Sequence, residues 1–108
     1  MVVALNFKSV SPYTFTSSAG KNQFRFTIKY SIGDDSYFMD IEILENNKYK
    51  MIAQCIRLSC GVDVFLPYKR YGLGTLLVVP TDSRNYADNN GPTADTILNR
   101  YCMVWEHD

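Results

Sequence analysis

Residues 23–58, QFRFTIKYSIGDDSYFMDIEILENNKYKMIAQCIRL, decide the fold of this chain. They contain three segments in which apolar and polar side chains alternate, and two short turn sequences separate the segments. Alternation with a period of two residues is typical of a β-strand with one face toward solvent. The stretch therefore predicts a three-stranded antiparallel meander on which the rest of the chain packs.

The first two segments carry opposite charges on their outward faces. Arg25 and Lys29 occupy that face in the first segment, and Asp40 and Glu42 occupy it in the second. Cross-strand pairs of opposite charge contribute about 0.2–1 kcal/mol each. We expect the two cations to lie near the two carboxylates when the strands pair.

The turns and the third segment add local detail to this meander. Residues 33–36 and 45–48 are rich in Gly, Asn and Asp, which tolerate the backbone of tight turns, so both predict hairpins. In the third segment the apolar positions change phase near Cys55, which predicts a β-bulge or a strong bend.

Shorter alternating segments flank the meander. Residues 3–7 predict an opening strand and residues 13–16 a short second piece, together a hairpin-like feature, with a loop over residues 17–22. Residues 62–66 and 101–105 predict two further strands. Thr93 is suited to cap a single helical turn that runs through Leu98.

The apolar run over residues 73–79 predicts a strand that is buried on both faces, or that buries one face in a partner. The whole pattern predicts an all-β fold. We expect a small antiparallel β-barrel or sandwich of about seven strands, with at most one short helical turn. Alternation is the same in a barrel and in a sandwich, so both architectures stay open.

Length and composition restrict the class of protein. A chain of 108 residues forms one domain, residues 1–108, and its formal net charge of zero argues against strong attraction to nucleic acid or an anionic membrane. The start of the chain lacks the basic and apolar regions of a signal peptide, and no apolar run approaches the ~20 residues of a membrane-spanning helix. We therefore expect synthesis in a reducing cytoplasm.

Residues suited to catalysis or metal binding are few. The single histidine, His107, lies next to the C-terminus, where we expect a frayed tail and hence a poor catalytic base. Residues 88–91 resemble part of a calcium loop but lack its remaining ligands. The three cysteines, Cys55, Cys60 and Cys102, form no Cys-x-x-Cys pair and are expected to be small buried groups. We expect no enzyme activity, no cofactor and no metal site.

Two segments are candidates for contact with a partner. Tyr68, Lys69, Arg70 and Tyr71 interleave aromatic and basic side chains, which suits either stacking on bases or anchoring a protein interface, and we favour the protein interface. Residues 81–95 predict a long polar loop of the kind that usually binds something or is disordered. That loop adds Arg84 and Tyr86 to the candidates.

The order of several motifs resembles the cyanophage baseplate plug family of contractile-tail phages. The matching pieces are residues 24–30, 37–43, 56–58 with Gly61, 74–79, and 92–98 followed by 101–105. They span residues 24–105, and their shared order and spacing carry the resemblance because each motif is short. The family usually has a glycine in the turn after its acidic strand, whereas this chain has Glu-Asn-Asn-Lys there.

This resemblance implies a non-enzymatic structural protein of the virion, made in the host cytoplasm and placed in the tail baseplate near the tube axis. It implies contacts with hub, spike or tube proteins in a homo- or hetero-oligomeric ring, and it supplies no catalytic residues. The alternative is an OB-like domain that binds single-stranded nucleic acid through the curved meander and residues 68–71. A small hydrolase or metal enzyme is disfavoured by the missing histidines and ligand sets.

Overall fold

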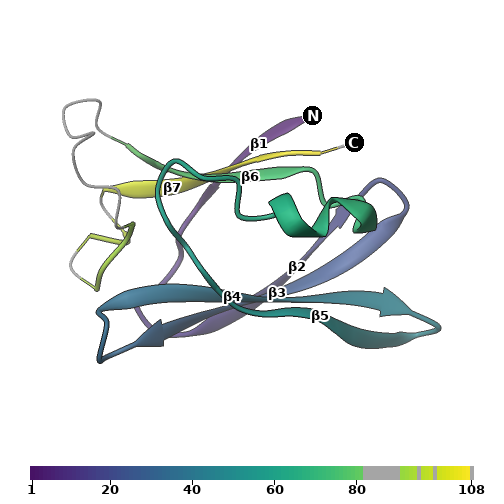
Figure 1. Ribbon diagram of the computed structural model, residues 1–108, viewed down its shortest axis with the longest axis horizontal. Helices are drawn as coiled ribbons and strands as arrows, with labels where there is room; N and C mark the ends of the chain where they lie inside the picture. The colour runs from purple at the N-terminus through teal and green to yellow at the C-terminus, as the bar shows by residue number, and fades with distance from the viewer. Residues whose placement is uncertain (82–90, 95, 99, 108) are drawn as a thin grey trace.

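A computed structural model describes residues 1–81, 91–94, 96–98 and 100–107. Within them the chain forms seven strands and one short 3-10 helix (Figure 1). In chain order these are β1 (Val2–Asn6), β2 (Tyr13–Ala19), β3 (Asn22–Ser31), β4 (Ser36–Glu45), β5 (Lys48–Arg57), η1 (Leu66–Tyr71), β6 (Thr75–Pro80) and β7 (Tyr101–Glu106).

The strands form two antiparallel sheets that pack face to face. One sheet has three strands in the order β1-β7-β6, and the other has four in the order β2-β3-β4-β5. The two sheets are not joined into a closed barrel, so the fold is a β-sandwich (Figure 1). This confirms the predicted all-β fold of about seven strands and decides between its two architectures.

The predicted meander is β3-β4-β5. Arg25 lies opposite Glu42 in the register of β3 and β4, and both predicted ion pairs form: Arg25 with Glu42, and Lys29 with Asp40 at 2.7 Å. The turn between β4 and β5 consists of Asn46 and Asn47, with φ of 51° and 64°. Asparagine adopts this left-handed backbone more readily than most residues, so the hairpin forms without glycine.

The predicted irregularity in the third strand is also present. Pairing between β4 and β5 shifts between Met39 and Ile41, and Cys55 has a φ of 56°. The carboxylate of Asp40 accepts a hydrogen bond from the Cys55 backbone N–H at 2.9 Å, which stabilises the bulge. The bulge turns the Cys55 side chain to solvent, so its predicted burial is wrong, and Cys60 and Cys102 are only partly buried.

The predicted N-terminal hairpin is wrong. β1 pairs with β7, whereas β2 continues to Ala19 and forms a hairpin with β3 through Gly20 and Lys21. The N-terminal ammonium also donates to the His107 carbonyl at 2.9 Å, and the His107 N–H donates to the Met1 carbonyl at 3.0 Å. The end of the chain is therefore held against β1 up to His107 rather than frayed.

Residues 62–66 do not form the predicted strand. The chain there makes two isolated bridges to β6, Cys60 with Val78 and Asp63 with Leu77, and then enters η1.

In β6, Leu76 and Val78 are buried while Leu77 and Val79 are partly exposed, so the strand buries one face rather than both. Near residue 97, the Ile97 N–H donates to the Thr93 carbonyl at 2.9 Å in a hydrogen-bonded turn.

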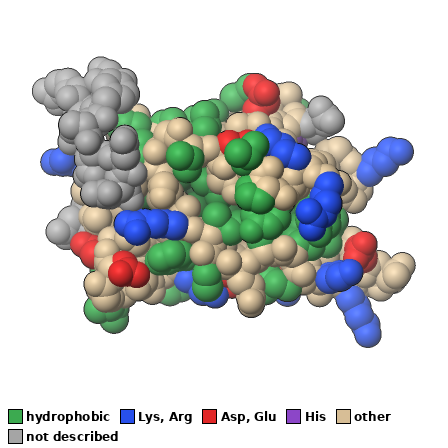
Figure 2. Space-filling model, in the orientation of Figure 1, with side chains coloured by type: hydrophobic (Ala, Val, Ile, Leu, Met, Phe, Trp, Pro, Cys, Tyr) green, Lys and Arg blue, Asp and Glu red, His purple; other side chains and the backbone are tan. Residues whose placement is uncertain are grey.

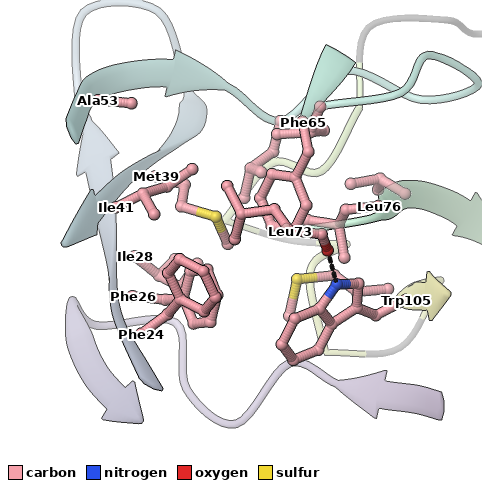
Figure 3. Close-up of a cluster of buried hydrophobic side chains, with 14 of the residues drawn as sticks. Phe24, Phe26, Ile28, Met39, Ile41, Ala53, Phe65, Leu73, Leu76 and Trp105 are labelled. Carbon is pink, nitrogen blue, oxygen red and sulfur yellow. Dashed lines mark hydrogen bonds between the residues drawn. The ribbon is translucent and has the colours of Figure 1, made fainter. Parts of the chain in front are cut away.

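Aromatic side chains from both sheets meet in the core (Figure 3). The ring of Phe26 lies 5.8 Å from that of Phe65 and 5.5 Å from that of Trp105, in stacked and edge-to-face arrangements. The Trp105 Nε1–H donates to the Leu73 carbonyl at 2.6 Å, so the buried indole has its polar atom satisfied. This contact fixes the chain just after η1 to the core.

Candidate partner-contact surface

The segment that contains Tyr68, Lys69, Arg70 and Tyr71 forms η1, in which two short 3-10 turns meet at a kink at Tyr68, with φ of −118° and ψ of 20°. Pro67 lies in its first turn, and Gly72 ends it with a φ of 78° and an N–H that donates to the Lys69 carbonyl at 3.1 Å. Proline at the start and glycine after the end are the usual boundaries of such a helix. The buried residues Phe65 and Leu73 flank η1, which in the view of Figure 1 lies between the two sheets toward one end of the sandwich.

Asp63 organises the backbone on both sides of η1. Its Oδ1 accepts hydrogen bonds from the N–H of Phe65 at 3.0 Å and of Leu76 at 3.1 Å, and its Oδ2 pairs with Lys69 Nζ at 2.7 Å. Burial by itself raises the pKa of Asp63, but the Lys69 ammonium and the two N–H donors outweigh it, so the pKa is lowered. Asp63 therefore joins η1 to β6 as a carboxylate.

The Lys69 ammonium is engaged within the chain. Besides Asp63, it donates to the Gly74 carbonyl at 2.8 Å and to the Thr75 hydroxyl at 2.6 Å. These three acceptors satisfy the three protons of the group. Of the candidate residues, Lys69 is thus the one whose charge is already used to hold η1 in place.

Arg70 is the cation that η1 presents outward. Its guanidinium lies 4.7 Å from the centroid of the Tyr71 ring and donates to the Tyr71 hydroxyl at 3.0 Å. The rings of Tyr68 and Tyr71 are partly buried against the core, and Asn22 donates to the Tyr71 carbonyl at 3.0 Å. Arginine and tyrosine held in this way form a rigid pair at low entropic cost, which suits a protein interface.

The other two candidates, Arg84 and Tyr86, and most of the predicted long loop, lie outside the described residues. The structure brings together the candidates of residues 68–71 and does not place these two.

Sequence reasoning missed two apolar residues beside this site. Val62 and Leu66 are 51% and 64% exposed, although the predicted strand placed them on the same face as the buried Val64. Figure 2 shows apolar side chains gathered across the middle of the face that carries η1, with Lys and Arg side chains near its edge. The signal that would have found Leu66 is Pro67 with Gly72, which marks a helical turn rather than a strand.

Two cations on the outward face of the meander are paired with carboxylates. Arg25 makes a bidentate contact with Glu42 at 2.9 and 2.6 Å and lies over the Tyr49 ring at 4.2 Å, and the Arg25 hydrogen bonds lower the pKa of Glu42. Lys29 is paired with Asp40, whereas Arg57 on the same face donates to the Ser36 hydroxyl. A groove that follows a nucleic-acid backbone needs several uncompensated positive charges, so the pairing of Arg25 and Lys29 favours the protein interface over the OB-like alternative.

The described residues contain no group of three or more His, Cys, Asp or Glu side chains arranged to hold a metal ion. None of the helical segments that the structure describes has the length and apolar character needed to span a membrane.

We expect Asp63→Asn to lower the free energy of unfolding by about 1–3 kcal/mol at neutral pH, because the variant loses its ion pair with Lys69. A carboxyl whose pKa is lowered by folding stabilises the protein above its ordinary pKa of 3.8, and this contribution disappears as the pH falls through the folded-state pKa. The difference between wild type and variant should therefore shrink below about pH 4. Urea unfolding at a series of pH values measures it, and a difference independent of pH would contradict the assignment.

The chain matches a known protein family over almost its full length. The model of the family described as cyanophage baseplate Pam3 plug gp18 matches residues 2–108. No curated protein matches the chain.

Proposed function

The chain belongs to the cyanophage baseplate plug family and is a structural component of the phage tail baseplate, and we propose that it sits near the axis of the tail tube and contacts hub, spike or tube proteins. In this proposal the sandwich is a non-enzymatic subunit of a homo- or hetero-oligomeric ring, made in the host cytoplasm before it is built into the virion. The observation that carries the proposal is the family match over residues 2–108.

The surface around η1 supports a role in protein contact. Leu66 exposes an apolar side chain in the same short helix as the Arg70 and Tyr71 pair, and the ion pair of Asp63 with Lys69 holds that helix. Aromatic and arginine side chains in a rigid setting are typical of residues that dominate binding energy. We propose that η1 is the main contact of this subunit with its baseplate neighbour, together with Arg84 and Tyr86.

Co-expression with the hub, spike and tube proteins of the same phage tests this function. Size-exclusion chromatography with light scattering should give a complex of defined mass that contains this chain and at least one of the three. The same experiment with single-stranded DNA provides the competing outcome. If the chain binds none of the three proteins but binds the DNA with an affinity that falls steeply with added salt, the proposal is contradicted.

Arg70→Glu and Leu66→Asp should each weaken binding to that partner at least about tenfold and leave the melting temperature of the free chain nearly unchanged. Matched controls make the same chemical changes at exposed sites away from η1. Arg100→Glu also reverses the charge of an exposed arginine, and Ile32→Asp also replaces an apolar residue, which is 86% exposed. Isothermal titration calorimetry measures the affinities, and equal losses in the controls and the η1 variants would show that η1 is not the contact.

A further inference from the structure

The sandwich has strand edges that differ in how well they are protected. The edge of β6 is covered, because the N–H groups of Gly61 and Val64 donate to the carbonyls of Val78 at 3.1 Å and Leu76 at 2.9 Å. The remaining outer edges, among the described strands, are those of β1, β2 and β5. An uncovered edge presents backbone groups that can pair with another chain.

β5 carries the features that prevent such pairing. Lys48, Lys50 and Arg57 are exposed along it, and its pairing with β4 shifts at two places. Lysine side chains and bulges on an edge strand are the usual means of blocking a further strand.

β1 and β2 carry none of these features. Their sequences, VVALN and YTFTSSA, contain no charged residue and no proline, and both strands pair with their neighbours in unbroken register. Their outer edges are therefore open to pairing with another chain.

The hydrogen bonds at the start of β1 fix which of its backbone groups point to the free side. Met1 and His107 exchange both of their backbone hydrogen bonds, and antiparallel pairs alternate between bonded and non-bonded positions. The N–H and C=O groups of Val2, Ala4 and Asn6 therefore point away from β7. Outside the strand ladders, the hydrogen bonds among the described residues include no partner for the backbone of Val2 or Ala4.

A small apolar pocket lies between the two unprotected edges. It has a volume of about 40 Å³ and is lined mostly by aromatic and aliphatic side chains: Leu5, Asn6, Lys8, Tyr13, Phe15 and Met103. Leu5 comes from β1, while Tyr13 and Phe15 come from β2, and all three side chains are only partly buried. A free strand edge beside an apolar pocket is the arrangement by which proteins bind an added strand and read its side chains.

We propose that the free edge of β1 binds one extended segment of another baseplate chain as an added strand, with an apolar side chain of that segment in the pocket. The segment has an apolar residue at the position that faces the pocket, because Leu5, Phe15 and Met103 line it and a charge buried against them would lose its hydration. This inference rests on the proposed function for the source of the segment. It places a second contact at the edge of β1 and the pocket beside β2, in addition to the contact through η1.

The occupant is a single extended segment. One strand beside β1 brings an alternate side chain to the pocket lined by residues of β1, β2 and β7. A second copy of this chain on the same edge would instead slow the exchange of the Ala4 and Asn6 amides in the free chain, and that result would overturn the assignment.

Amide hydrogen exchange followed by NMR, on the labelled chain free and in the co-expressed baseplate complex, tests this proposal. In the free chain the amides of Val3 and Leu5 should exchange slowly and those of Ala4 and Asn6 quickly. In the complex, exchange at Ala4 and Asn6 should slow at least about tenfold, the factor expected for one new hydrogen bond. Unchanged exchange at both amides in a complex that has formed would overturn the inference and leave the proposed function standing, whereas failure to form any complex contradicts the proposed function itself.

Ala4→Pro tests the same edge by affinity. The substitution removes an N–H that makes no bond to β7, so β1 should stay paired while the added strand loses a donor and meets the proline ring. Binding of the complex partner should fall at least about tenfold, while the matched variant Ala4→Ser, which keeps the N–H, should bind like wild type. Equal affinity of the two variants would overturn the inference, and the exchange experiment on the wild-type chain decides the matter should Ala4→Pro not fold.

Discussion

Replacing Trp105 with alanine is expected to lower the free energy of unfolding by about 3–5 kcal/mol, the range for removing a large buried aromatic side chain. Trp105 is 1% exposed and packs against Phe26 and Phe65 from the facing side of the core (Figure 3). The variant loses these contacts and also leaves the Leu73 carbonyl without its 2.6 Å donor. Since total stabilities of small domains are about 5–15 kcal/mol, a loss of this size leaves little margin.

Urea unfolding followed by circular dichroism measures this loss, because Trp105 is the single tryptophan and its fluorescence disappears in the variant. Trp105→Phe is the matched control: it keeps an aromatic ring but removes the N–H, so the expected loss is smaller, about 1–3 kcal/mol. A loss below about 1 kcal/mol for the alanine variant would contradict a core centred on this residue.

The second large effect is expected for Gly74→Ala, which should destabilise the chain by about 3 kcal/mol. Gly74 has a φ of 77°, and a β-carbon there would overlap the carbonyl oxygen of Glu106 and lie 3.0 Å from the Cα of His107. The cost combines left-handed backbone strain of about 1–2 kcal/mol with displacement of the β7 backbone. The residue is thus required where the chain leaves η1 and passes close to β7.

Alanine substitutions at two other glycines distinguish the cost of backbone strain from the cost of displacing the β7 backbone. Gly20 has a φ of 60° but open space around it, and Gly33 has open space and no positive φ in the left-handed region. Thermal unfolding of the three alanine variants should therefore rank Gly74 as the most damaging site, Gly20 as intermediate and Gly33 as nearly neutral. Equal effects at Gly74 and Gly20 would show that the close approach to Glu106 is not tight.

The β3-β4-β5 meander could be predicted from the sequence because its interactions join residues that are close along the chain. Arg25 and Glu42 are brought together by one hairpin, and the phase change near Cys55 is visible as soon as the alternation is counted. The strand that pairs with β1 could not be predicted from the sequence. Alternation indicates which face of a strand is buried but not which strand lies beside it. β1 pairs with β7 at the far end of the chain, and no local pattern distinguishes this from a hairpin with β2.

The contact surface around η1 could be predicted only in part, because it too depends on contacts between residues that are not neighbours in the sequence. Alternation at Val62 and Val64 favoured a strand, while Pro67 and Gly72 marked the helical turn that forms. The role of Lys69 depends on Asp63, Gly74 and Thr75, which meet only after η1 has folded back onto β6. The free edge of β1 depends on the pairing of the whole three-stranded sheet.

Cryo-electron microscopy of purified tails of the phage that encodes this chain is the measurement that tests its central role most directly. We expect density for the seven-stranded sandwich in the baseplate close to the tube axis, with η1 against a hub, spike or tube protein and an extended segment beside β1. Intact baseplates that lack this chain, or that carry it only at the periphery away from the tube axis, would contradict the proposed function.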